Sequence, residues 1–228
     1  MSDWIEDTLE SDGVLKNKLG IKNAADLRQK EYFLSASNAA LFLNMEPKIK
    51  DISDMKKIHK ILFGQLYDWA GKYRPGDFSK NGFAFLEHKK FDNAEFFIND
   101  LIKKQPDKDP LRTADYAALL ESINYMHPFR EGNGRACKVF LLAYAANHGQ
   151  TIEYSRKDEE MITHLQSANV AEIAKLIKIE DTPTRSAAFK IMAYNSLPNK
   201  TQNELKAKYA KQDKTRITRK DKDNDLEL

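Results

Sequence analysis

Residues 127–135 gather side chains that could act together on a phosphate group. The segment reads His-Pro-Phe-Arg-Glu-Gly-Asn-Gly-Arg and separates two apolar stretches. Gly132 and Gly134 permit positive φ angles and a close approach of a ligand to the backbone. A glycine-rich turn that leads into a helix directs backbone N–H groups into a concavity, where the helix dipole adds partial positive charge. The turn therefore predicts an anion site.

The charged side chains near this turn fit nucleotide phosphate chemistry. Arg135 offers a guanidinium fork to phosphate oxygens. Glu131 suits its position if Mg²⁺ lies between it and the phosphates, because Mg²⁺ is usually held by a carboxylate plus phosphate oxygens. His127 is the nearby group suited to accept a proton near neutral pH.

Each of these residues also has a structural explanation when it is taken alone. His127 could cap a helix end, Glu131 could be a solvated acid, and Phe129 is expected in the core under either interpretation. Cys137 fits a buried small side chain better than a nucleophile. The occurrence of all the polar groups within nine residues is what favours phosphate chemistry.

The elements that must position this turn are mostly helices, so the sequence predicts an all-α fold. Apolar residues recur at helical spacing on both sides of the turn, and glycine or proline marks several ends. The predicted helices run from Asn23 to before Pro47, from Asp54 to Gly71, over 91–104, from Asp109-Pro110 onward, over 136–148, and around 159–168, 170–179 and 185–196.

One short segment predicts a β-hairpin on this helical body. Asn81-Gly82 is the dipeptide most typical of a two-residue hairpin turn, and Phe83 and Phe85 alternate after it. A lone hairpin is marginally stable, so we expect it to present an edge or to cover a site. The alternative is an ordinary surface loop with some buried phenylalanine.

The length of 228 residues suits one domain with appendages. We expect an N-terminal extension over 1–12, a body over 13–198 and a charged tail over 199–228. The tail mixes lysine and arginine with acids, which predicts a fraying helix or a disordered segment. A nucleic-acid arm is the weaker alternative, because acidic residues interrupt the basic ones and Tyr209 is the sole aromatic residue.

Composition excludes several classes of protein. No apolar run approaches the ~18 residues of a membrane span, and the acidic N-terminus lacks the features of a secretory signal. The single cysteine suits a reducing cytoplasm. A net charge of +3 is too small to predict direct nucleic-acid binding. We therefore expect a cytoplasmic protein.

The turn and its flanks resemble the Fic family of enzymes, whose motif is His-x-Phe-x-(Asp/Glu)-Gly-Asn-Gly-Arg-x-x-Arg. His127 to Arg135 matches every defining position without a gap. The resemblance extends to Leu62–Arg74, to the hairpin at Phe78–Phe85 and to His164–Asn169, and spans about 13–179. It implies a Fic-type helical bundle over 13–198 with a short β-hairpin flap over the active site.

The resemblance also implies a reaction: transfer of AMP from ATP to a Tyr, Thr or Ser hydroxyl of a target protein, with release of pyrophosphate. By analogy His127 deprotonates the hydroxyl and Glu131 holds Mg²⁺. The expected ATP-binding residues are Gly132, Asn133, Gly134, Arg135, Lys138, Lys80, Asn81, Gly82, Phe83, Met161 and Asn169. The flap would hold the target segment by pairing backbone to backbone.

Two features depart from the family pattern. The second motif arginine is Lys138 here, which keeps the charge and loses the bidentate fork. The family's inhibitory Ser/Thr-x-x-x-Glu-Gly/Asn has no convincing match, since Ser2 and Ser155 start segments with the wrong final residue. We therefore expect a separate antitoxin-like partner ahead of self-inhibition.

The target of the reaction is left open by the sequence. One hypothesis is a bacterial toxin that modifies a cytoplasmic protein such as a type II topoisomerase. Another is an effector that modifies a small GTPase in a host cell. The alternative from a different class is a catalytically weak nucleotide-binding or interaction module.

Overall fold

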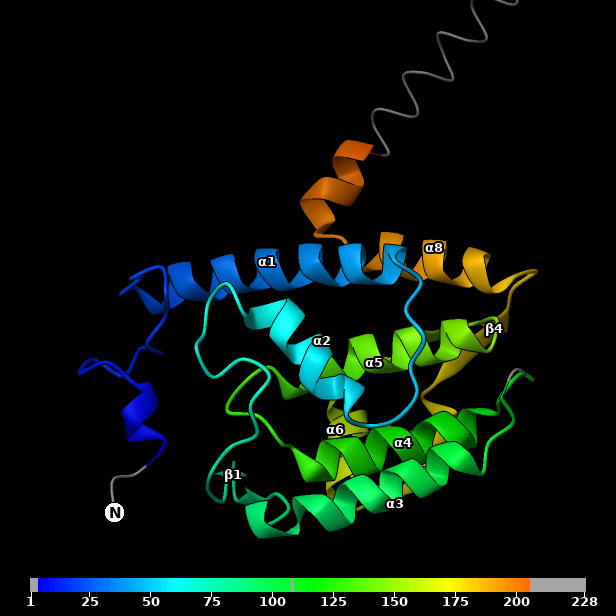
Figure 1. Ribbon diagram of the computed structural model, residues 1–228, viewed down its shortest axis with the longest axis horizontal. Coiled ribbons are helices and arrows are strands. Elements are labelled where there is room, and N and C mark those ends of the chain that lie inside the picture. Colours follow the sequence, from blue (N-terminus) through cyan, green and yellow to red (C-terminus); the bar gives the residue numbers. More distant parts are fainter. Residues whose placement is uncertain (1–3, 108, 206–228) are drawn as a thin grey trace, which may run out of the picture.

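The computed structural model describes residues 4–107 and 109–205. This part of the chain is mainly helical, with two small antiparallel hairpins, so the predicted all-α body is confirmed. Figure 1 shows the helices in stacked layers, with α1 and α8 on one side, α2 and α5 in the middle, and α3 and α4 on the other side. Within the described ranges no helix has both the length and the apolar character needed to cross a membrane.

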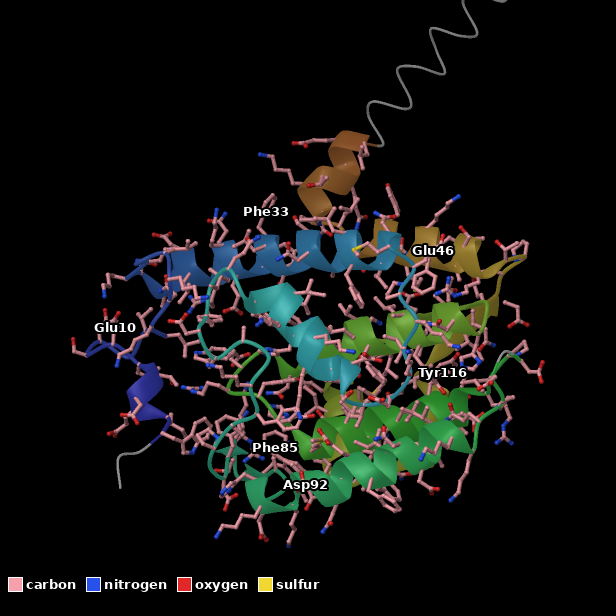
Figure 2. The ribbon with its side chains drawn as sticks, in the orientation of Figure 1. Glu10, Phe33, Glu46, Phe85, Asp92 and Tyr116 are labelled. Carbon is pink, nitrogen blue, oxygen red and sulfur yellow. The ribbon has the colours of Figure 1, made fainter. Side chains whose placement is uncertain are left out.

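The outer layer pairs α1 (Ala24–Asn44) with α8 (Arg185–Ser196). Helix α1 begins where the Asn23 side chain accepts hydrogen bonds from two first-turn N–H groups, as predicted for this position. Its exposed face carries Phe33, which points away from the body, whereas Tyr116 of the opposite layer is fully buried (Figure 2).

The inner layer consists of α2 (Asp54–Phe63) and α5 (Asn133–Asn147), which pack against each other. Helix α5 is buried at most of its positions and also contacts α1, α4 and α8, so it forms the centre of the core. Packing against several helices therefore fixes the position of α5 and of the turn that precedes it. Gly149, at φ +71°, follows its end, as the sequence predicts.

The third layer holds α3 (Phe91–Lys103) and α4 (Thr113–Met126). Two short helices, α6 (Glu159–Gln166) and α7 (Val170–Lys175), pack against α4. Short 3₁₀ turns lie at Glu6–Thr8 and His88–Lys90.

The predicted hairpin is confirmed at the expected turn. Strands β1 (Ser79–Lys80) and β2 (Phe83–Ala84) are antiparallel, with Lys80 opposite Phe83. Asn81 and Gly82 both have positive φ, at 51° and 79°. These angles suit a two-residue turn of the mirror-image kind, which asparagine and glycine adopt most readily.

A second antiparallel pair of strands was not predicted from the sequence. Strand β3 (Gln150–Glu153) pairs antiparallel with β4 (Lys178–Asp181), in the register Gln150 opposite Asp181. The helix predicted over 170–179 is wrong at its end, because α7 stops at Lys175 and the chain turns into β4. Two strands of four residues carry too little alternation to distinguish them from helix ends.

Two further predicted helix boundaries are wrong. The helix predicted from Asp54 to Gly71 ends at Phe63, and Gly64 caps it. Leu66 and Tyr67 continue the apolar pattern and are buried, but they lie in a non-helical turn. Helix α4 starts at Thr113 instead of Asp109, because the Asp115 carboxylate accepts a hydrogen bond from the Arg112 N–H and fixes the first turn there.

The described part of the N-terminal extension lies against the body. The Trp4 ring is 6.2 Å from the Phe78 ring, and Thr8 accepts a hydrogen bond from Arg130. In the tail, residues 199–205 are helical and Gln202 donates to the Leu197 carbonyl. The remaining tail lies outside the described residues, so the division into 1–12, 13–198 and 199–228 stays a proposal.

Candidate active site

The motif turn links the end of α4 to the start of α5. His127 ends α4 in the left-handed region, at φ 42° and ψ 56°. Gly132 is also left-handed, at φ 81°, and immediately precedes α5. A Cβ atom at Gly132 would lie 2.5 Å from the Phe63 ring. Glycine is therefore required here both by backbone conformation and by the close approach of α2.

The Asn133 side chain holds the turn together from inside. Its Oδ1 accepts from the Phe129 N–H and its Nδ2 donates to the Phe129 carbonyl, both at 2.8 Å. Both of its polar atoms are engaged by the loop, and its predicted role as a phosphate ligand stays a prediction. What Asn133 retains for a ligand is its backbone N–H in the first turn of α5.

Buried His59 supports the same turn from α2. The Gly71 N–H donates to its Nδ1 and its Nε2 donates to the Glu131 carbonyl, both at 2.9 Å. Because a carbonyl only accepts, the proton must reside on Nε2. The ring also stacks on Phe129 at 3.8 Å, and burial lowers the His59 pKa to about 4.

His127 faces an aromatic wall formed by the flap. The Phe85 ring stacks on its imidazole at 3.7 Å, and Phe78 lies 5.9 Å away. Arg74 Nε donates to the His127 carbonyl at 2.9 Å and fixes the backbone. Nδ1 is buried, and no hydrogen bond of ordinary geometry reaches it within the described residues. Burial, reinforced by Arg74 and Lys80, lowers the His127 pKa to about 3, and a weaker contact with the Asn124 backbone acts in the opposite direction.

A cavity of about 380 Å³ opens beside His127. Polar residues of the turn, the flap and the β3–α6 loop line it: Lys80, His127, Glu131, Asn133, Gly134 and Arg156. Apolar side chains of α4 and α6 also line it: Leu120, Ile123, Met161 and Leu165. An amphipathic molecule with an anionic end matches this division.

Glu131 lines the cavity with a half-exposed carboxylate. Its Oε1 accepts from the Gly132 N–H at 2.9 Å and lies 3.6 Å from Arg135 Nη2. The Gly132 N–H is thereby occupied. The N–H groups of Asn133 and Gly134, in the first turn of α5, remain to face a ligand.

Arg135 is held differently from the prediction. Its guanidinium forms an ion pair with buried Glu31 of α1, whose carboxylate also accepts from the Tyr67 hydroxyl. It lines a second, larger cavity and is absent from the walls of the cavity beside His127. Sequence reasoning missed Glu31 and Tyr67. The only signal was an acid on the buried face of α1.

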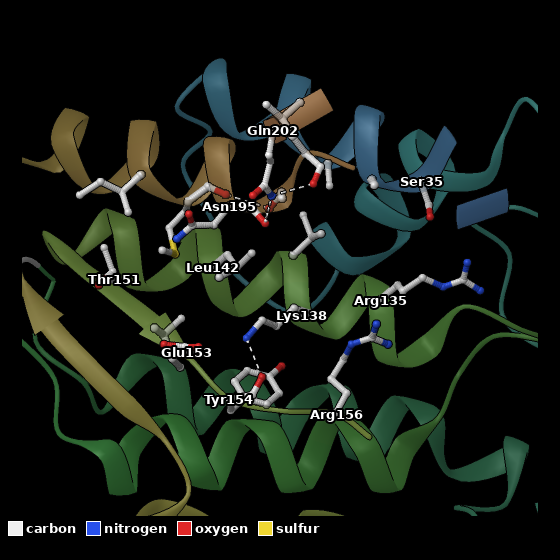
Figure 3. Close-up of a pocket in the computed structure, with 18 of the residues that line it drawn as sticks. Ser35, Arg135, Lys138, Leu142, Thr151, Glu153, Tyr154, Arg156, Asn195 and Gln202 are labelled. Carbon is white, nitrogen blue, oxygen red and sulfur yellow. Dashed lines mark hydrogen bonds between the residues drawn. The ribbon is translucent and has the colours of Figure 1, made fainter. Parts of the chain in front are cut away.

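The larger cavity, about 710 Å³, lies along α5 and is also lined by residues of α1, β3 and α8 (Figure 3). Among the groups that line it are Arg135, Lys138, Tyr154 and Arg156. It lacks His127, Glu131 and Gly134. We therefore place the chemistry in the smaller cavity, where the candidate base and the start of α5 lie together.

The remaining predicted residues divide into two groups. Lys80 and Met161 line the cavity beside His127, as expected. Asn81, Gly82, Phe83, Lys138 and Asn169 do not line it. Asn169 is exposed and caps α7 through the Glu172 N–H, because an asparagine before a helix satisfies first-turn donors. Phe83 packs against Phe85, 5.3 Å away, and so supports the aromatic wall.

Comparison with known sequences gives consistent results. Residues 50–145 match the sequence model of the Fic/DOC family. Protein adenylyltransferase VbhT of Bartonella schoenbuchensis is 31% identical over 156 residues, which cover 66% of this chain and 33% of VbhT. The chain thus spans about a third of that relative's length. The Salmonella typhimurium protein named "Probable protein adenylyltransferase Fic" is 30% identical over 152 residues, 62% of this chain and 72% of that protein.

Solved structures share the fold. BepC of Bartonella tribocorum with bound AMPPNP superposes with a TM-score of 0.64 at 20% identity, covering 77% of this chain and 98% of that one. The ADP-bound N-terminal Fic domain of a VirB-translocated Bep effector from Bartonella quintana gives 0.67 at 22% identity, covering 78% and 96%. The expected Fic-type bundle is confirmed. With its uninterrupted motif, the flap over His127 and these relatives, the chain belongs to the Fic/DOC family.

Proposed function

We propose that the protein transfers AMP from ATP to a Tyr, Thr or Ser hydroxyl of a target protein and releases pyrophosphate. The observation that carries the proposal is the position of His127, a neutral base in the same cavity as the free N–H groups at the start of α5. The relatives named as adenylyltransferases and the nucleotide-bound neighbours support it.

The reaction assigns one proton transfer to His127. The target hydroxyl oxygen attacks the α-phosphorus, and the bond between the α-phosphorus and the oxygen leading to the β-phosphate breaks. His127 accepts the hydroxyl proton as the new O–P bond forms. A pKa near 3 keeps the free imidazole unprotonated at neutral pH, so the base is available without a prior deprotonation. The Phe85 stack and the Arg74 bond hold the ring in place.

The phosphates would lie at the start of α5. Its first-turn N–H groups and helix dipole stabilise negative charge that develops on the α-phosphate. The adenosine would lie against the apolar side chains of Met161 and Leu165. Arg135 is a less direct participant than the motif suggests, because Glu31 neutralises it. Its role as a direct phosphate ligand is therefore a proposal that competes with a role in fixing α5 to α1.

The site fits a magnesium ion that is brought in with the phosphates. Glu131 presents its carboxylate to the cavity, and the described residues form no cluster of three or more acidic, histidine or cysteine ligands. One carboxylate plus phosphate and water oxygens is the set Mg²⁺ prefers. Bound there, Mg²⁺ would offset the charge of the α- and β-phosphates. We propose Glu131 as its protein ligand.

The flap is the proposed dock for the target, and a small antitoxin-like protein is the proposed inhibitor. Residues Ser79 and Ala84 present the outer edges of the hairpin to solvent. An extended target segment could add there as a further strand. BepC is described as a translocated effector. We propose a bacterial toxin or effector role for this chain as well, acting in the bacterial cytoplasm or after delivery into a host cell.

A labelling experiment tests the proposal. The purified protein is incubated with Mg²⁺, ATP labelled at the α-phosphate and lysates of bacterial or animal cells. Mass spectrometry then locates an added AMP on hydroxyl side chains. We expect labelled lysate proteins with wild type and none with His127→Ala. Binding of ATP without any labelling would instead favour a nucleotide-binding or interaction module.

A further inference from the structure

We propose that Arg156, and not the motif residue Lys138, supplies the second cation for the ATP phosphates in this protein. The inference rests on the proposed AMP transfer and assigns a phosphate-binding role outside the motif. It concerns the loop between β3 and α6, which the motif comparison does not reach.

Lys138 is engaged by Tyr154 in the larger cavity. Its Nζ donates to the Tyr154 carbonyl at 3.1 Å and lies 3.7 Å from the centre of the Tyr154 ring. It lines the larger cavity and does not line the one that contains His127. Burial lowers its pKa to about 8. To reach a phosphate at the start of α5, Lys138 would have to give up both contacts with Tyr154.

Arg156 instead lies directly over the motif turn. A Cβ atom at Gly134 would be 3.1 Å from Arg156 Nη1, so the guanidinium contacts the first turn of α5. The residue lines the cavity with His127 and also the larger one, and Figure 3 shows its side chain beside that of Arg135. Arg156 is solvent-exposed, so a ligand can reach it.

The charges around Arg156 favour an anionic ligand. Across the described ranges no hydrogen bond or ion pair involves its guanidinium, and the charged side chain acting on it is the like-charged Arg135. Arg135 has Glu31 and Glu131 as carboxylate partners, whereas Arg156 has none among the described residues. A guanidinium fork beside a row of N–H groups matches the geometry of phosphate oxygens.

Position within the cavity indicates which phosphates Arg156 contacts. The reacting α-phosphate must lie near His127 and the start of α5, and Arg156 lines the same cavity and contacts that helix start at Gly134. The phosphates that continue from the α-phosphate can therefore lie beside Arg156. When the bond to the α-phosphate breaks, the pyrophosphate gains negative charge, which the guanidinium stabilises.

Titration calorimetry with Mg·ATP and with AMP tests this assignment. The proteins are wild type, Arg156→Ala, Lys138→Ala and the control Lys157→Ala, which removes the neighbouring exposed cation. We expect Arg156→Ala to weaken Mg·ATP binding by about 10- to 100-fold, the range for one lost charge-assisted contact. AMP binding should change less than threefold, and Lys138→Ala should weaken Mg·ATP binding less than Arg156→Ala does. Lys157→Ala should match wild type.

Three results would overturn the inference. They are unchanged Mg·ATP affinity in Arg156→Ala, equal losses of ATP and AMP affinity, and a larger loss in Lys138→Ala than in Arg156→Ala. The second result would mean that Arg156 only maintains the shape of the site. If wild type binds Mg·ATP but transfers no AMP in lysates, the proposed function fails while these affinities still decide the role of Arg156.

Discussion

The motif turn and the flap meet at His127, yet they are built in opposite ways. The turn over 127–135 is fastened by buried polar bonds on several sides, from Asn133, His59 and Arg74. The flap consists of two paired residues per strand, and three of those four are exposed. One region has its conformation fixed by the core, and the other presents backbone edges to solvent.

The difference suits the role that we propose for each region. A proton acceptor has to be placed within hydrogen-bond reach of its substrate, and small misplacements are costly in rate. A docking strand needs free backbone groups and tolerates many side chains in its partner. Arg74 joins the two regions, since it binds the carbonyls of His127 and of Leu86, just after the flap.

The largest expected effect comes from removing the base. His127→Ala should lower AMP transfer by about 10³- to 10⁴-fold, toward the upper end for a general base. ATP should still bind, because the first-turn N–H groups of α5 are untouched. Transfer is measured as label incorporated from ATP labelled at the α-phosphate, and binding by calorimetry. Transfer at the wild-type rate would remove His127 from the mechanism.

The second effect tests whether the turn depends on the two buried hydrogen bonds between Asn133 and Phe129. Asn133→Ala leaves the Phe129 N–H and carbonyl buried without partners, which should cost about 2–4 kcal/mol of stability. The shifted turn should also lower transfer by about 100-fold. Urea unfolding and the labelling assay measure the two quantities.

Asn147→Ala is the matched control, at the other end of α5. Its amide donates to the Pro47 and Ala143 carbonyls and lines neither cavity. This variant should lose stability but keep most of its activity. If both variants lost activity equally, the hydrogen bonds of Asn133 would have no specific effect on the active site.

The sequence predicted the residues of the turn better than the residues from other elements that hold the turn in place. His127 to Arg135 are neighbours in the chain, so their spacing alone brings the base, the acid and the helix start together. Glu31, His59 and Arg156 reach the site from three other elements. Their roles depend on how helices pack, which a single sequence does not reveal.

Fold prediction failed where local patterns were ambiguous. Leu66 and Tyr67 are buried, and their spacing therefore extended the predicted helix beyond its true end at Phe63. The hairpin at Asn81-Gly82 was found because its turn chemistry is specific. The β3–β4 pair has no such turn, because α6 and α7 lie between the two strands in the chain.

The third effect is the pH dependence of the stability that His59 gives to the motif turn. His59 supports the turn as a neutral ring, and its folded pKa of about 4 lies below the ordinary 6.5. The unfolded chain therefore binds the proton first as pH falls. The contribution to stability is complete above about pH 6.5 and is lost progressively as pH falls toward 4.

At pH 5 about 2 kcal/mol of this stability has been lost, because pH 5 lies 1.5 pH units below the ordinary pKa of 6.5 and each unit corresponds to 1.36 kcal/mol. Urea unfolding at pH 7 and pH 5 measures the loss, and NMR titration of the His59 ring checks its cause. A ring that titrates near 6.5 in the folded protein would contradict the assigned burial effect.

The smallest effect tests the free edge of the flap. The Phe85 N–H donates to the Phe78 carbonyl, and Lys80 is opposite Phe83. Because antiparallel pairs alternate, the N–H groups of Phe83 and Phe85 point into the hairpin and that of Ala84 points outward. Proline at 83 would break the hairpin itself, whereas proline at 84 removes only the outward donor.

We therefore expect Ala84→Pro to lower modification of lysate proteins by about tenfold, as a target strand loses one backbone partner. ATP binding should stay within twofold of wild type, because residue 84 does not line the cavity. Ala84→Val keeps the N–H and adds bulk, so it controls for side-chain size and should remain close to wild type. If Ala84→Pro labels the same proteins at the wild-type rate, the target does not pair with β2. The same substitution at Ser79 then tests the opposite edge, where the outward groups belong to β1.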